Sequence, residues 1–318
     1  MKYIYLTKKR ENIQAVFQTE ETVYTKEDLL AAPQRFAEVE TVFSTWGMPA
    51  MTEEEIRRCL PRLKAVFYGA GSVQSFARPF LACGVRIFSA WAANAVPVAE
   101  YTVAQIILAN KGFFKTMRYS DKTTAKELFS HYPGNYEVKI GIIGAGMIGT
   151  MVIERLKSYD LQVLVFDPFL SEEKAAKLEV EKTSLERLFA ECSVVSNHLA
   201  NNEQTQGILH GRLFETMLPY ATFINTGRGA QVVEEELIAT LTARPDLTAI
   251  LDVTHPEPPL EGSPLYTLPN CILTPHIAGS SGREVARMGQ YMKEEYERFC
   301  QGVPCLYEVT LKMLETMA

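Results

Sequence analysis

The sequence has no CxxC pair, although it contains six cysteines among its 318 residues. Scattered cysteines in a chain of this length are typical of reduced thiols in a reducing compartment. The first residues become charged by Lys8, too early for the apolar segment of a signal peptide. No apolar run approaches the length needed to span a membrane. We therefore expect a cytoplasmic protein, without a metal site.

Positive charge is also scarce, since the formal net charge is -6 and no basic tract is longer than KKR at residues 8–10. Such a surface repels phosphate backbones and anionic membranes, so neither nucleic acid nor a membrane is expected as a partner. Hydrophobic residues make up 47% and charged residues 22%, which is typical of a packed globular protein. The length suffices for two domains of ordinary size.

Short apolar runs alternate with amphipathic stretches from about residue 138 onwards. The runs span residues 138–143, 162–167, 193–198, 222–226, 248–253 and 271–276. Helices are expected between them, at residues 147–159, 184–192 and 234–243. Runs that are almost continuously apolar are typical of strands buried on both faces. The alternation predicts an α/β fold with a doubly wound parallel sheet.

The first hundred residues follow the same scheme on a smaller scale. Four further strands are expected at residues 2–7, 41–46, 64–69 and 85–90. Two long helices are expected at residues 95–119 and 282–300, where apolar positions recur at helical spacing. We therefore predict two domains joined by two long helices, with a short C-terminal tail that can return to the first domain.

The stretch GIIGAGMIG contains the spacing GxGxxG at Gly144, Gly146 and Gly149. The first glycine permits a tight turn, the second lets the backbone approach a pyrophosphate, and the third allows close packing of helix and strand. The amides of Met147 and Ile148 then point at the phosphates from a helix N-terminus. Glycine turns also exist purely for packing, so this pattern alone leaves both interpretations open.

An acidic residue at the expected distance strengthens the dinucleotide interpretation. The strand after the glycine turn ends in Asp167, about twenty residues on. A carboxylate there accepts hydrogen bonds from the adenosine ribose and repels a 2′-phosphate. The sequence continues as DPFL, without an arginine, which favours NAD over NADP. Asp167 could instead serve as a helix cap or a turn residue.

Three polar residues follow three different strands at their carboxyl ends: Arg228, Glu257 and His276. In an open parallel sheet these ends lie along one edge, which also carries the glycine turn. Arginine binds a carboxylate bidentately, and histidine exchanges a proton with an alcohol or carbonyl oxygen. A carboxylate bonded to the second imidazole nitrogen fixes the tautomer. With a bound nicotinamide, this set suits hydride exchange between a 2-hydroxy acid and a 2-oxo acid.

The loop DVTHPEPP raises the question of which histidine Glu257 serves. His255 lies two residues away, whereas His276 ends a neighbouring core strand and would need a polar partner if it were buried. We predict that Glu257 bonds to His276. Taken singly, Arg228 could be a solvated or salt-bridged surface group, His276 a core histidine and Glu257 a solvated loop acid. His198 and His210 are interpreted mostly as structural, although His198 ends a strand at the cofactor edge.

The chain resembles the D-isomer-specific 2-hydroxyacid dehydrogenases, which include glyoxylate and hydroxypyruvate reductases and phosphoglycerate dehydrogenase. Four motifs carry the resemblance in order: GIIGAGMIG with Asp167, INTGRGAQVVEEEL, LDVTHPEPP and TPHIAG. Farther upstream, LKAVFYGAGSV and ANAVPVAEYT are similar to the family's substrate loop and its first interdomain helix. The resemblance runs over most of the chain.

The resemblance implies a Rossmann NAD domain inserted in a flavodoxin-like substrate domain, usually assembled as a homodimer through the interdomain helices. We place the substrate domain at residues 1–99 and 282–318 and the NAD domain at residues 100–281. The implied reaction interconverts a small D-2-hydroxy acid and its 2-oxo acid, and a glyoxylate-like or hydroxypyruvate-like substrate is expected.

The resemblance also assigns roles to individual residues. Arg228 is the substrate anchor, His276 the acid/base and Glu257 its partner. The carboxylate of the substrate is expected at Ala70, Gly71 and Ser72, together with Arg228 and His276. Cofactor contacts are expected at Gly144, Gly146, Met147, Ile148, Gly149, Asp167, His198, Thr226, Asp252 and Gly279.

Some positions depart from the family pattern. The segment VQSFA stands where the family commonly has VDNID, and SAWAANAV replaces the usual prolyl-glycine turn. These departures bring Trp91 close to the predicted substrate site, and Trp46 follows another strand of the first domain. Both tryptophans could narrow the substrate pocket or cover the domain core. The departures affect the identity of the substrate rather than the type of reaction.

Other functions on the same fold remain as alternatives. Formate dehydrogenases usually have glutamine where Glu257 stands, and phosphite dehydrogenase has a lysine in the substrate loop, where GAGSV has none. Transcriptional corepressors that sense NAD can retain all three polar residues. Turnover of a 2-oxo acid, as opposed to NADH binding without turnover, distinguishes an enzyme from such a binding protein.

Overall fold

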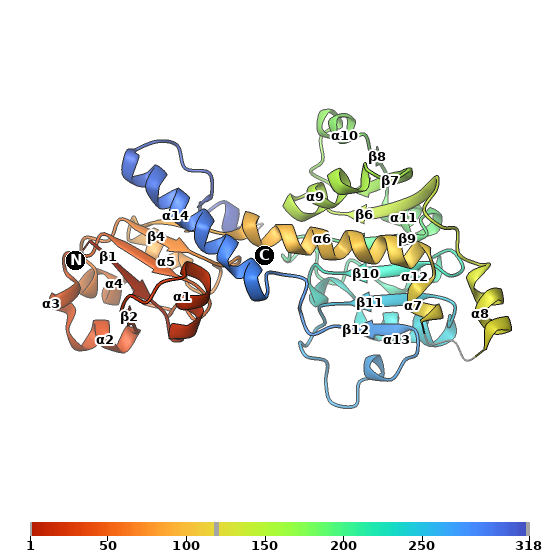
Figure 1. Ribbon diagram of the computed structural model, residues 1–318, viewed down its shortest axis with the longest axis horizontal. Helices are drawn as coiled ribbons and strands as arrows, with labels where there is room; N and C mark the ends of the chain where they lie inside the picture. The colour runs from red at the N-terminus through yellow and green to blue at the C-terminus, as the bar shows by residue number, and fades with distance from the viewer. Residues whose placement is uncertain (1, 118–120, 316–318) are drawn as a thin grey trace. The chain divides into compact units, whose positions relative to one another are not determined.

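The computed structural model describes residues 2–117 and 121–315. The chain divides into two compact units: unit 1 comprises residues 1–95 and 280–318, and unit 2 comprises residues 96–279 (Figure 1). Each unit contains a sheet of its own, covered by helices on both faces.

The sheet of unit 1 has the strand order β13-β5-β4-β3-β1-β2. Its strands are β1 (Tyr3–Leu6), β2 (Val23–Tyr24), β3 (Thr41–Ser44), β4 (Ala65–Tyr68), β5 (Arg86–Ser89) and β13 (Glu308–Val309). The first five are parallel in the flavodoxin-like order, and β13 pairs antiparallel with β5. The four predicted strands are present, and the C-terminal tail returns to this sheet. The two-residue strands β2 and β13 were not predicted.

Alternating side chains of these strands enter two separate cores. One core packs Tyr5 and its neighbours against α1 (Arg10–Phe17) and α14 (Val285–Gln301). The other packs Leu6 and its neighbours against four short helices. These are α2 (Lys26–Ala31), α3 (Pro33–Phe36), α4 (Glu53–Cys59) and α5 (Ala77–Ala82). Burial on both faces explains why the strand sequences are almost wholly apolar.

The sheet of unit 2 is wholly parallel, with the order β12-β11-β10-β9-β6-β7-β8. Its strands are β6 (Val138–Ile143), β7 (Leu161–Phe166), β8 (Glu181–Lys182), β9 (Val194–Asn197), β10 (Thr222–Asn225), β11 (Thr248–Leu251) and β12 (Cys271–Leu273). This is the Rossmann order, which reverses direction between β6 and β9. The six predicted strands are present, and β8 is an additional two-residue strand. Ligands of such sheets bind beyond the carboxyl ends of the strands, at the reversal point.

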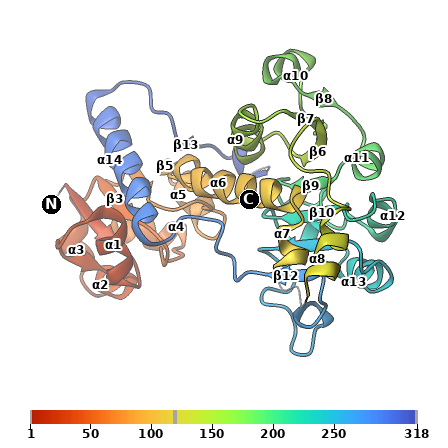
Figure 2. The same cartoon turned by 45° about the vertical axis from the view of Figure 1, so that its right-hand side comes forward.

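Helices cover both faces of this sheet (Figure 2). One face packs against α6, α9 (Met147–Leu156) and α10 (Glu172–Leu178), and the other against α11 (Leu185–Glu191), α12 (Gly211–Glu215) and α13 (Glu234–Ala243). The remaining helices of unit 2 are α7 (Phe113–Thr116) and α8 (Lys122–Phe129). Short 3-10 helices are η1 (Gly229–Gln231), η2 (Pro264–Tyr266), η3 (Gly282–Glu284) and η4 (Met313–Glu315).

Helix α6 (Trp91–Asn110) differs from the prediction of a helix at residues 95–119. It begins four residues earlier and ends before Gly112, whose left-handed φ of 67° is typical of a helix end. Residues 118 and 119 of the predicted helix lie outside the described residues. By length and composition α6 could cross a membrane, so the expectation that no such run exists was wrong. Since 56% of its apolar window is buried, α6 has the character of a core helix.

Candidate active site

The three glycines that follow β6 are required for different physical reasons. Gly144 adopts a left-handed φ of 90°, and a Cβ atom there would lie 2.9 Å from the carbonyl oxygen of His198. A Cβ atom on Gly149 would lie 1.9 Å from the carbonyl oxygen of Gly144, so helix and turn touch directly. At Gly146 a Cβ atom would meet no heavy atom within 4 Å. Two glycines therefore serve packing, and Gly146 leaves open space beside the turn.

Helix α9 begins at Met147, directly after this open space. The first amides of a helix, here those of Met147 and Ile148, have no acceptor within the helix, and the helix dipole favours a negative charge beside them. The turn therefore combines free space with an anion-binding helix end, as a bound pyrophosphate requires.

Asp167 lies immediately after β7 and bonds to the same turn. Its Oδ2 atom accepts a hydrogen bond from the amide of Ala145 at 2.7 Å, and its Oδ1 atom accepts one from the amide of Phe169 at 2.8 Å. The Nζ atom of Lys174 on α10 donates to the carbonyl oxygen of Ala145 at 2.8 Å. Asp167 and Lys174 thus bind the amide and the carbonyl group of the same residue of the glycine turn, Ala145. A carboxylate has about four acceptor sites, so Asp167 can still accept hydrogen bonds from a ribose.

Glu257 and His276 lie side by side, although 19 positions separate them in the sequence. The Nδ1 atom of His276 lies 2.6 Å from Oε1 of Glu257, and both side chains are about half exposed. His255, the nearer histidine in sequence, bonds through its backbone amide to Glu234 at 3.4 Å instead. The carboxylate therefore orients the imidazole through Nδ1 and leaves Nε2 for exchange with another molecule.

Asp252 shapes the turn that presents His276. Its buried carboxylate accepts hydrogen bonds from the amides of Ile277 and Ala278, each at 2.9 Å, and from the hydroxyl of Thr274 at 2.5 Å. The backbone of His276 has a left-handed φ of 54°, which costs a non-glycine residue about 1–2 kcal/mol. The three hydrogen bonds to Asp252 offset this cost. Asp252, predicted near the nicotinamide, is thus also a structural support of the histidine.

Arg228 lies in the loop between β10 and η1 and is partly buried. Its Nη1 atom donates to the carbonyl oxygen of Gly227 at 2.7 Å. Burial lowers the pKa of the Arg228 guanidinium, and the charge of Glu257 acts in the opposite direction. A cation held out of water beside this carboxylate has a strong tendency to bind a further anion.

The loop that carries Arg228 packs directly against the loop that carries Glu257. A Cβ atom on Gly229 would lie 2.0 Å from the carbonyl carbon of Thr254 and 2.5 Å from the nitrogen of His255. Only glycine permits this approach of the two backbones. Arg228, Glu257 and His276 therefore converge from three loops at the carboxyl edge of one sheet.

His198 and Thr226 belong to a buried polar chain at this edge. The Nε2 atom of His198 lies 2.9 Å from the hydroxyl of Ser196, and its Nδ1 atom lies 3.3 Å from the hydroxyl of Thr226. The hydroxyl of Thr226 lies 3.3 Å from that of Thr102. Burial lowers the pKa of His198 to about 3, so its imidazole is neutral near pH 7. His198 is suited to hydrogen bonding rather than to proton exchange.

The predicted substrate loop follows β4 in unit 1. The hydroxyl of Ser89 donates to the carbonyl oxygens of Ala70 at 2.9 Å and Gly71 at 2.5 Å, while Ser72 is exposed. Asn94 lies beside this loop, since a Cβ atom on Gly71 would be 3.6 Å from its Nδ2 atom. The loop therefore has a fixed backbone and an exposed end.

The two tryptophans of unit 1 differ in their surroundings. Trp46 is 40% exposed, and its carbonyl oxygen accepts hydrogen bonds from Thr7 and Asn12. Trp91, at the start of α6, packs edge-on against Tyr307 with ring centroids 6.1 Å apart. Trp91 is thus partly engaged in the packing of unit 1, whereas the indole of Trp46 faces solvent.

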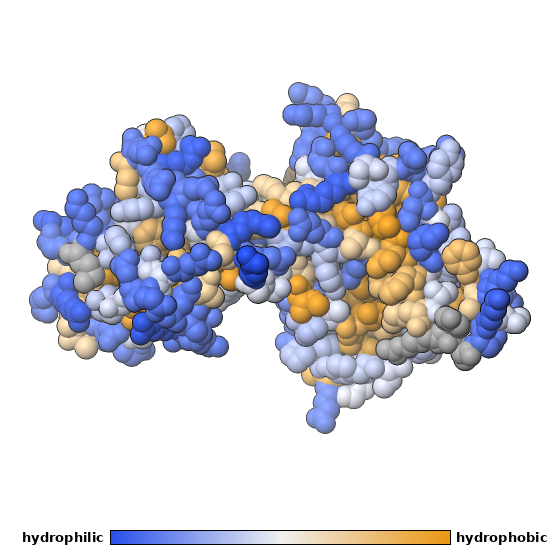
Figure 3. All heavy atoms as spheres, viewed as in Figure 1, coloured by the Kyte–Doolittle hydropathy of each residue, from blue (hydrophilic) through white to orange (hydrophobic). Residues whose placement is uncertain are grey.

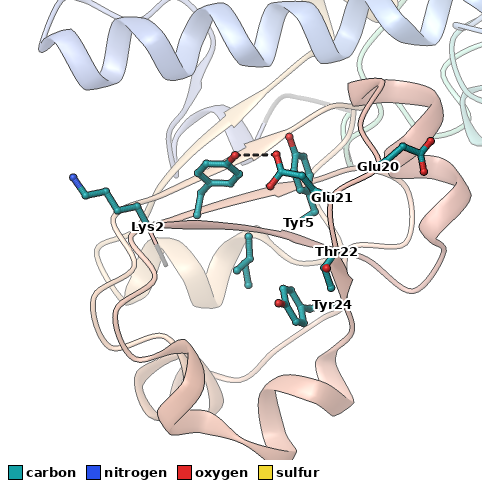
Figure 4. A pocket seen from close by; sticks show the side chains of 8 residues that line it. Lys2, Tyr5, Glu20, Glu21, Thr22 and Tyr24 are labelled. Atoms are coloured by element: carbon teal, nitrogen blue, oxygen red, sulfur yellow. Dashed lines mark hydrogen bonds between the residues drawn. The ribbon is translucent and has the colours of Figure 1, made fainter.

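A hollow of about 510 Å³ on unit 1 contains none of the predicted site residues (Figure 4). The hydroxyl of Tyr3 donates to Glu21 across it at 2.9 Å. Its lining consists of Lys2, Tyr3, Ile4, Tyr5, Glu20, Glu21, Thr22 and Tyr24.

Among the residues that the structure describes, no group of three His, Cys, Asp or Glu side chains could hold a metal ion. The candidate chemistry of unit 2 therefore lies at the carboxyl edge of its sheet.

Comparison with known proteins identifies the family of this chain. The sequence profile of the D-isomer specific 2-hydroxyacid dehydrogenase NAD binding domain matches residues 103–278, more than half of the chain. The chain belongs to this family. The matched segment contains the glycine turn, Asp167, Arg228 and Glu257 together with His276.

The matches to curated relatives cover only part of the length of those relatives. The D-3-phosphoglycerate dehydrogenase of Archaeoglobus fulgidus is 29% identical over 243 residues, which are 73% of this chain and 44% of that protein. The 2-hydroxyacid dehydrogenase YoaD of Bacillus subtilis, named as putative, is 31% identical over 208 residues, which are 62% of this chain and 59% of that protein. The chain thus spans about half the length of these relatives.

Solved structures share the fold over the whole chain. The NAD-complexed D-isomer specific 2-hydroxyacid dehydrogenase of Lactobacillus delbrueckii has a TM-score of 0.79 at 18% identity, covering 98% of this chain and 100% of that chain. A D-2-hydroxyisocaproate dehydrogenase has a TM-score of 0.78 at 20% identity, covering 98% and 100%. Identities this low show the fold alone.

The residues of this family member fit NAD, the cofactor of the family domain. The open space at Gly146, the first amides of α9 and the unused acceptor sites of Asp167 suit a pyrophosphate and a ribose. Gly279, also predicted at this site, is the last residue of unit 2.

Several residues of the site were not predicted from the sequence. Lys174 lies on the exposed face of α10, where a lysine carries no signal. Thr274 bonds to Asp252, and its hydroxyl also lies 3.1 Å from that of Tyr101. Gly229 could have been recognised, because glycines on both sides of an arginine indicate a loop with close neighbours.

Proposed function

We propose that this family member is an NAD-dependent dehydrogenase that interconverts a small D-2-hydroxy acid and its 2-oxo acid. The contact of 2.6 Å between His276 and Glu257 is the observation that carries the proposal, because a carboxylate-oriented imidazole is suited to proton transfer. The partly buried Arg228, whose guanidinium is influenced by the charge of Glu257, supports an acidic substrate. Family membership supports the same reaction.

Each of the three side chains has a defined part in this reaction. NAD supplies the hydride acceptor or donor when it is bound. Arg228 binds the substrate carboxylate and orients the neighbouring carbonyl group. His276 gives a proton from Nε2 to the carbonyl oxygen during reduction and removes it from the hydroxyl during oxidation. Glu257 accepts the Nδ1–H hydrogen bond, fixes the tautomer and stabilises the imidazolium.

The remaining residues are proposed to determine which cofactor and which substrate the protein binds. Asp167 favours NAD over NADP, because a carboxylate repels the 2′-phosphate. The loop of Ala70, Gly71 and Ser72 is proposed to bind the substrate carboxylate. A small substrate such as glyoxylate or hydroxypyruvate is proposed, since Trp46 and Trp91 both follow strands of the same unit.

A cytoplasmic homodimer is proposed as the working form. Apolar side chains gather on the face of unit 2 that carries α6 and α7 (Figure 3). Large apolar residues of this region that are 38–50% exposed include Leu108, Phe113, Met117 and Phe129. Exposed apolar side chains in such number are typical of a surface that another protein covers.

The proposal is tested by NADH oxidation with 2-oxo acids graded by side-chain size, including a phosphorylated acid, and by repetition with NADPH. Strong turnover of small acids with a preference for NADH is the expected result. Turnover of a large or phosphorylated acid would correct the substrate class. NADH binding without turnover of any acid would contradict the enzyme and favour an NAD-sensing binding protein.

A further inference from the structure

We infer that three buried amide side chains, Asn197, Asn225 and Gln231, act as positioning residues for Arg228. The inference rests on the proposed role of Arg228 as the substrate anchor. These three side chains, here called the amide triad, are each no more than 1% exposed. They come from the ends of β9 and β10 and from η1, so neighbouring elements of the sheet bring them together.

The amide triad is internally connected through Asn197. Its Nδ2 atom donates to Oδ1 of Asn225 at 3.0 Å and to Oε1 of Gln231 at 2.6 Å. Asn197 and Asn225 are paired residues in the parallel ladder of β9 and β10, so their side chains lie on the same face. The ladder therefore fixes the position of two members, and Gln231 joins them from the loop.

The triad holds both backbone hydrogen-bonding groups of Arg228. Oε1 of Gln231 accepts the hydrogen bond of the Arg228 amide at 3.1 Å. Nδ2 of Asn225 donates to the Arg228 carbonyl oxygen at 3.3 Å, and Oδ1 of Asn225 accepts from the amide of Gly227 at 3.0 Å. Arg228 lies outside the strands, where no neighbouring strand can bind its backbone. The amide triad supplies hydrogen bonds to its amide and its carbonyl group instead.

The remaining contacts of the triad connect Arg228 to a second loop. Nε2 of Gln231 donates to the carbonyl oxygens of Leu199 and Ala200, each at 2.9 Å. A Cβ atom on Gly227 would lie 2.8 Å from Nδ2 of Asn197 and 2.9 Å from Oε1 of Gln231. The backbone before Arg228 therefore packs directly on the triad, and nothing larger than glycine fits between them.

Buried amides with this many hydrogen bonds are costly to disturb. A buried donor or acceptor left without a partner is strongly unfavourable, and a shift of the loop is the way to regain partners. A guanidinium that binds a carboxylate bidentately tolerates little displacement. Loss of the triad should therefore displace Arg228 and weaken the binding of a 2-oxo acid more than the binding of NADH.

The test replaces Gln231 by a side chain of similar size without hydrogen-bonding groups, in the variant Gln231→Met. The matched control is Asn270→Leu, because Asn270 is also buried and donates to two carbonyl oxygens, those of Leu241 and Arg244. Asn270 precedes β12 and so lies at the amino end of its strand, away from the Arg228 loop. Both variants lose buried hydrogen bonds, but only Gln231→Met removes one from Arg228.

Four quantities are compared for each protein: the KM and the kcat for the best 2-oxo acid, the Kd of NADH, and the Kd with which the NADH complex binds oxamate, an unreactive analogue of a 2-oxo acid. Gln231→Met should raise KM and the Kd of oxamate by about tenfold or more, with a smaller effect on kcat. Its Kd for NADH, and all values of Asn270→Leu, should change by less than about twofold.

Unchanged KM and oxamate affinity in Gln231→Met would overturn the inference, as would equal losses in Asn270→Leu. If Gln231→Met does not fold, Asn225→Ala with Asn270→Ala as its control gives the same comparison from the carbonyl side of Arg228. If the wild-type protein binds oxamate but turns over no 2-oxo acid, the proposed function is contradicted. The Kd of oxamate for the variants then still tests the inference on the amide triad. A wild-type protein that neither binds oxamate nor turns over a 2-oxo acid would overturn both the proposed function and this inference.

Discussion

His276 is held through its side chain by Glu257 and through its backbone by the turn around Asp252. The left-handed backbone of His276 directs the imidazole away from the path of its strand, and Glu257 then fixes the rotation of the ring. Both contacts come from residues 252–257, which include Pro256. A single loop therefore determines both the position and the tautomer of the proposed acid/base.

Replacement of Glu257 by glutamine tests the carboxylate as the partner of His276. Glu257→Gln retains the size of the side chain but cannot stabilise an imidazolium, so kcat should fall by roughly 100-fold. The affinity for NADH should stay unchanged. His255→Asn serves as the control, because His255 lies two residues away and bonds elsewhere. A similar loss of kcat in both variants would contradict the assigned pairing.

The buried His198 should make stability depend on pH. Its folded pKa is about 3, whereas an unfolded histidine titrates near 6.5, so the unfolded chain binds more protons between these values. The contribution of His198 to stability is therefore constant above about pH 6.5, and between about pH 6.5 and about pH 3 it falls with decreasing pH by about 1.4 kcal/mol per pH unit.

Urea unfolding of the wild type and of His198→Asn at about pH 7 and about pH 5.5 checks this dependence. The free energy of unfolding of the wild type should fall by about 1 kcal/mol more than that of the variant. Equal pH dependence in both proteins would show that His198 does not carry this effect.

At the scale of elements, different glycines of the glycine turn serve folding and the proposed binding of the cofactor. The turn, the start of α9 and the end of β7 meet within a few residues. Gly149 lets the helix touch the turn, whereas Gly146 borders free space. The two glycines therefore predict opposite effects of the same substitution.

Gly146→Ala should change the free energy of unfolding by less than about 0.5 kcal/mol and raise the Kd of NADH about tenfold. Its φ of -69° suits alanine, so only the added methyl group acts, within the space proposed for the pyrophosphate. Gly149→Ala should lower the free energy of unfolding by about 1–3 kcal/mol, because its Cβ atom collides with a carbonyl oxygen. Thermal unfolding and NADH titration of both variants check the contrast. Tight NADH binding by Gly146→Ala would contradict the pyrophosphate site.

The elements that could be predicted from sequence are those with a strong local pattern. All ten expected strands are present, because a strand buried on both faces is almost wholly apolar. The strands β2, β8 and β13 have two residues each, too few for any period to be visible. The end of α6 was misplaced, because apolar spacing continues beyond Asn110 while the left-handed Gly112 ends the helix.

The site could be predicted in part from the topology of the expected sheet. Residues at the ends of strands share one edge by topology, which indicated Arg228 and His276 from sequence alone. The amide triad could not be found in this way, because its members meet only when the register of β9 and β10 and the path of η1 are known. Lys174 was missed because its partner is a backbone carbonyl oxygen.

At the scale of the molecule, the chain combines a flavodoxin-like sheet and a Rossmann sheet, each with its own cores on both faces. The Rossmann unit contains the cofactor turn and all three proposed catalytic side chains. It corresponds to the family domain that the sequence profile matches. Unit 1 contains the loop that is proposed to bind the substrate carboxylate.

The most direct test of this account compares wild type and His276→Asn in the reduction of the best 2-oxo acid, with NADH binding measured on both proteins. Asparagine can bond to Glu257 but cannot donate a proton from the position of Nε2. The account predicts turnover by the wild type, a loss of roughly 100-fold or more in kcat in the variant, and equal affinity for NADH. Undiminished turnover by His276→Asn would contradict it.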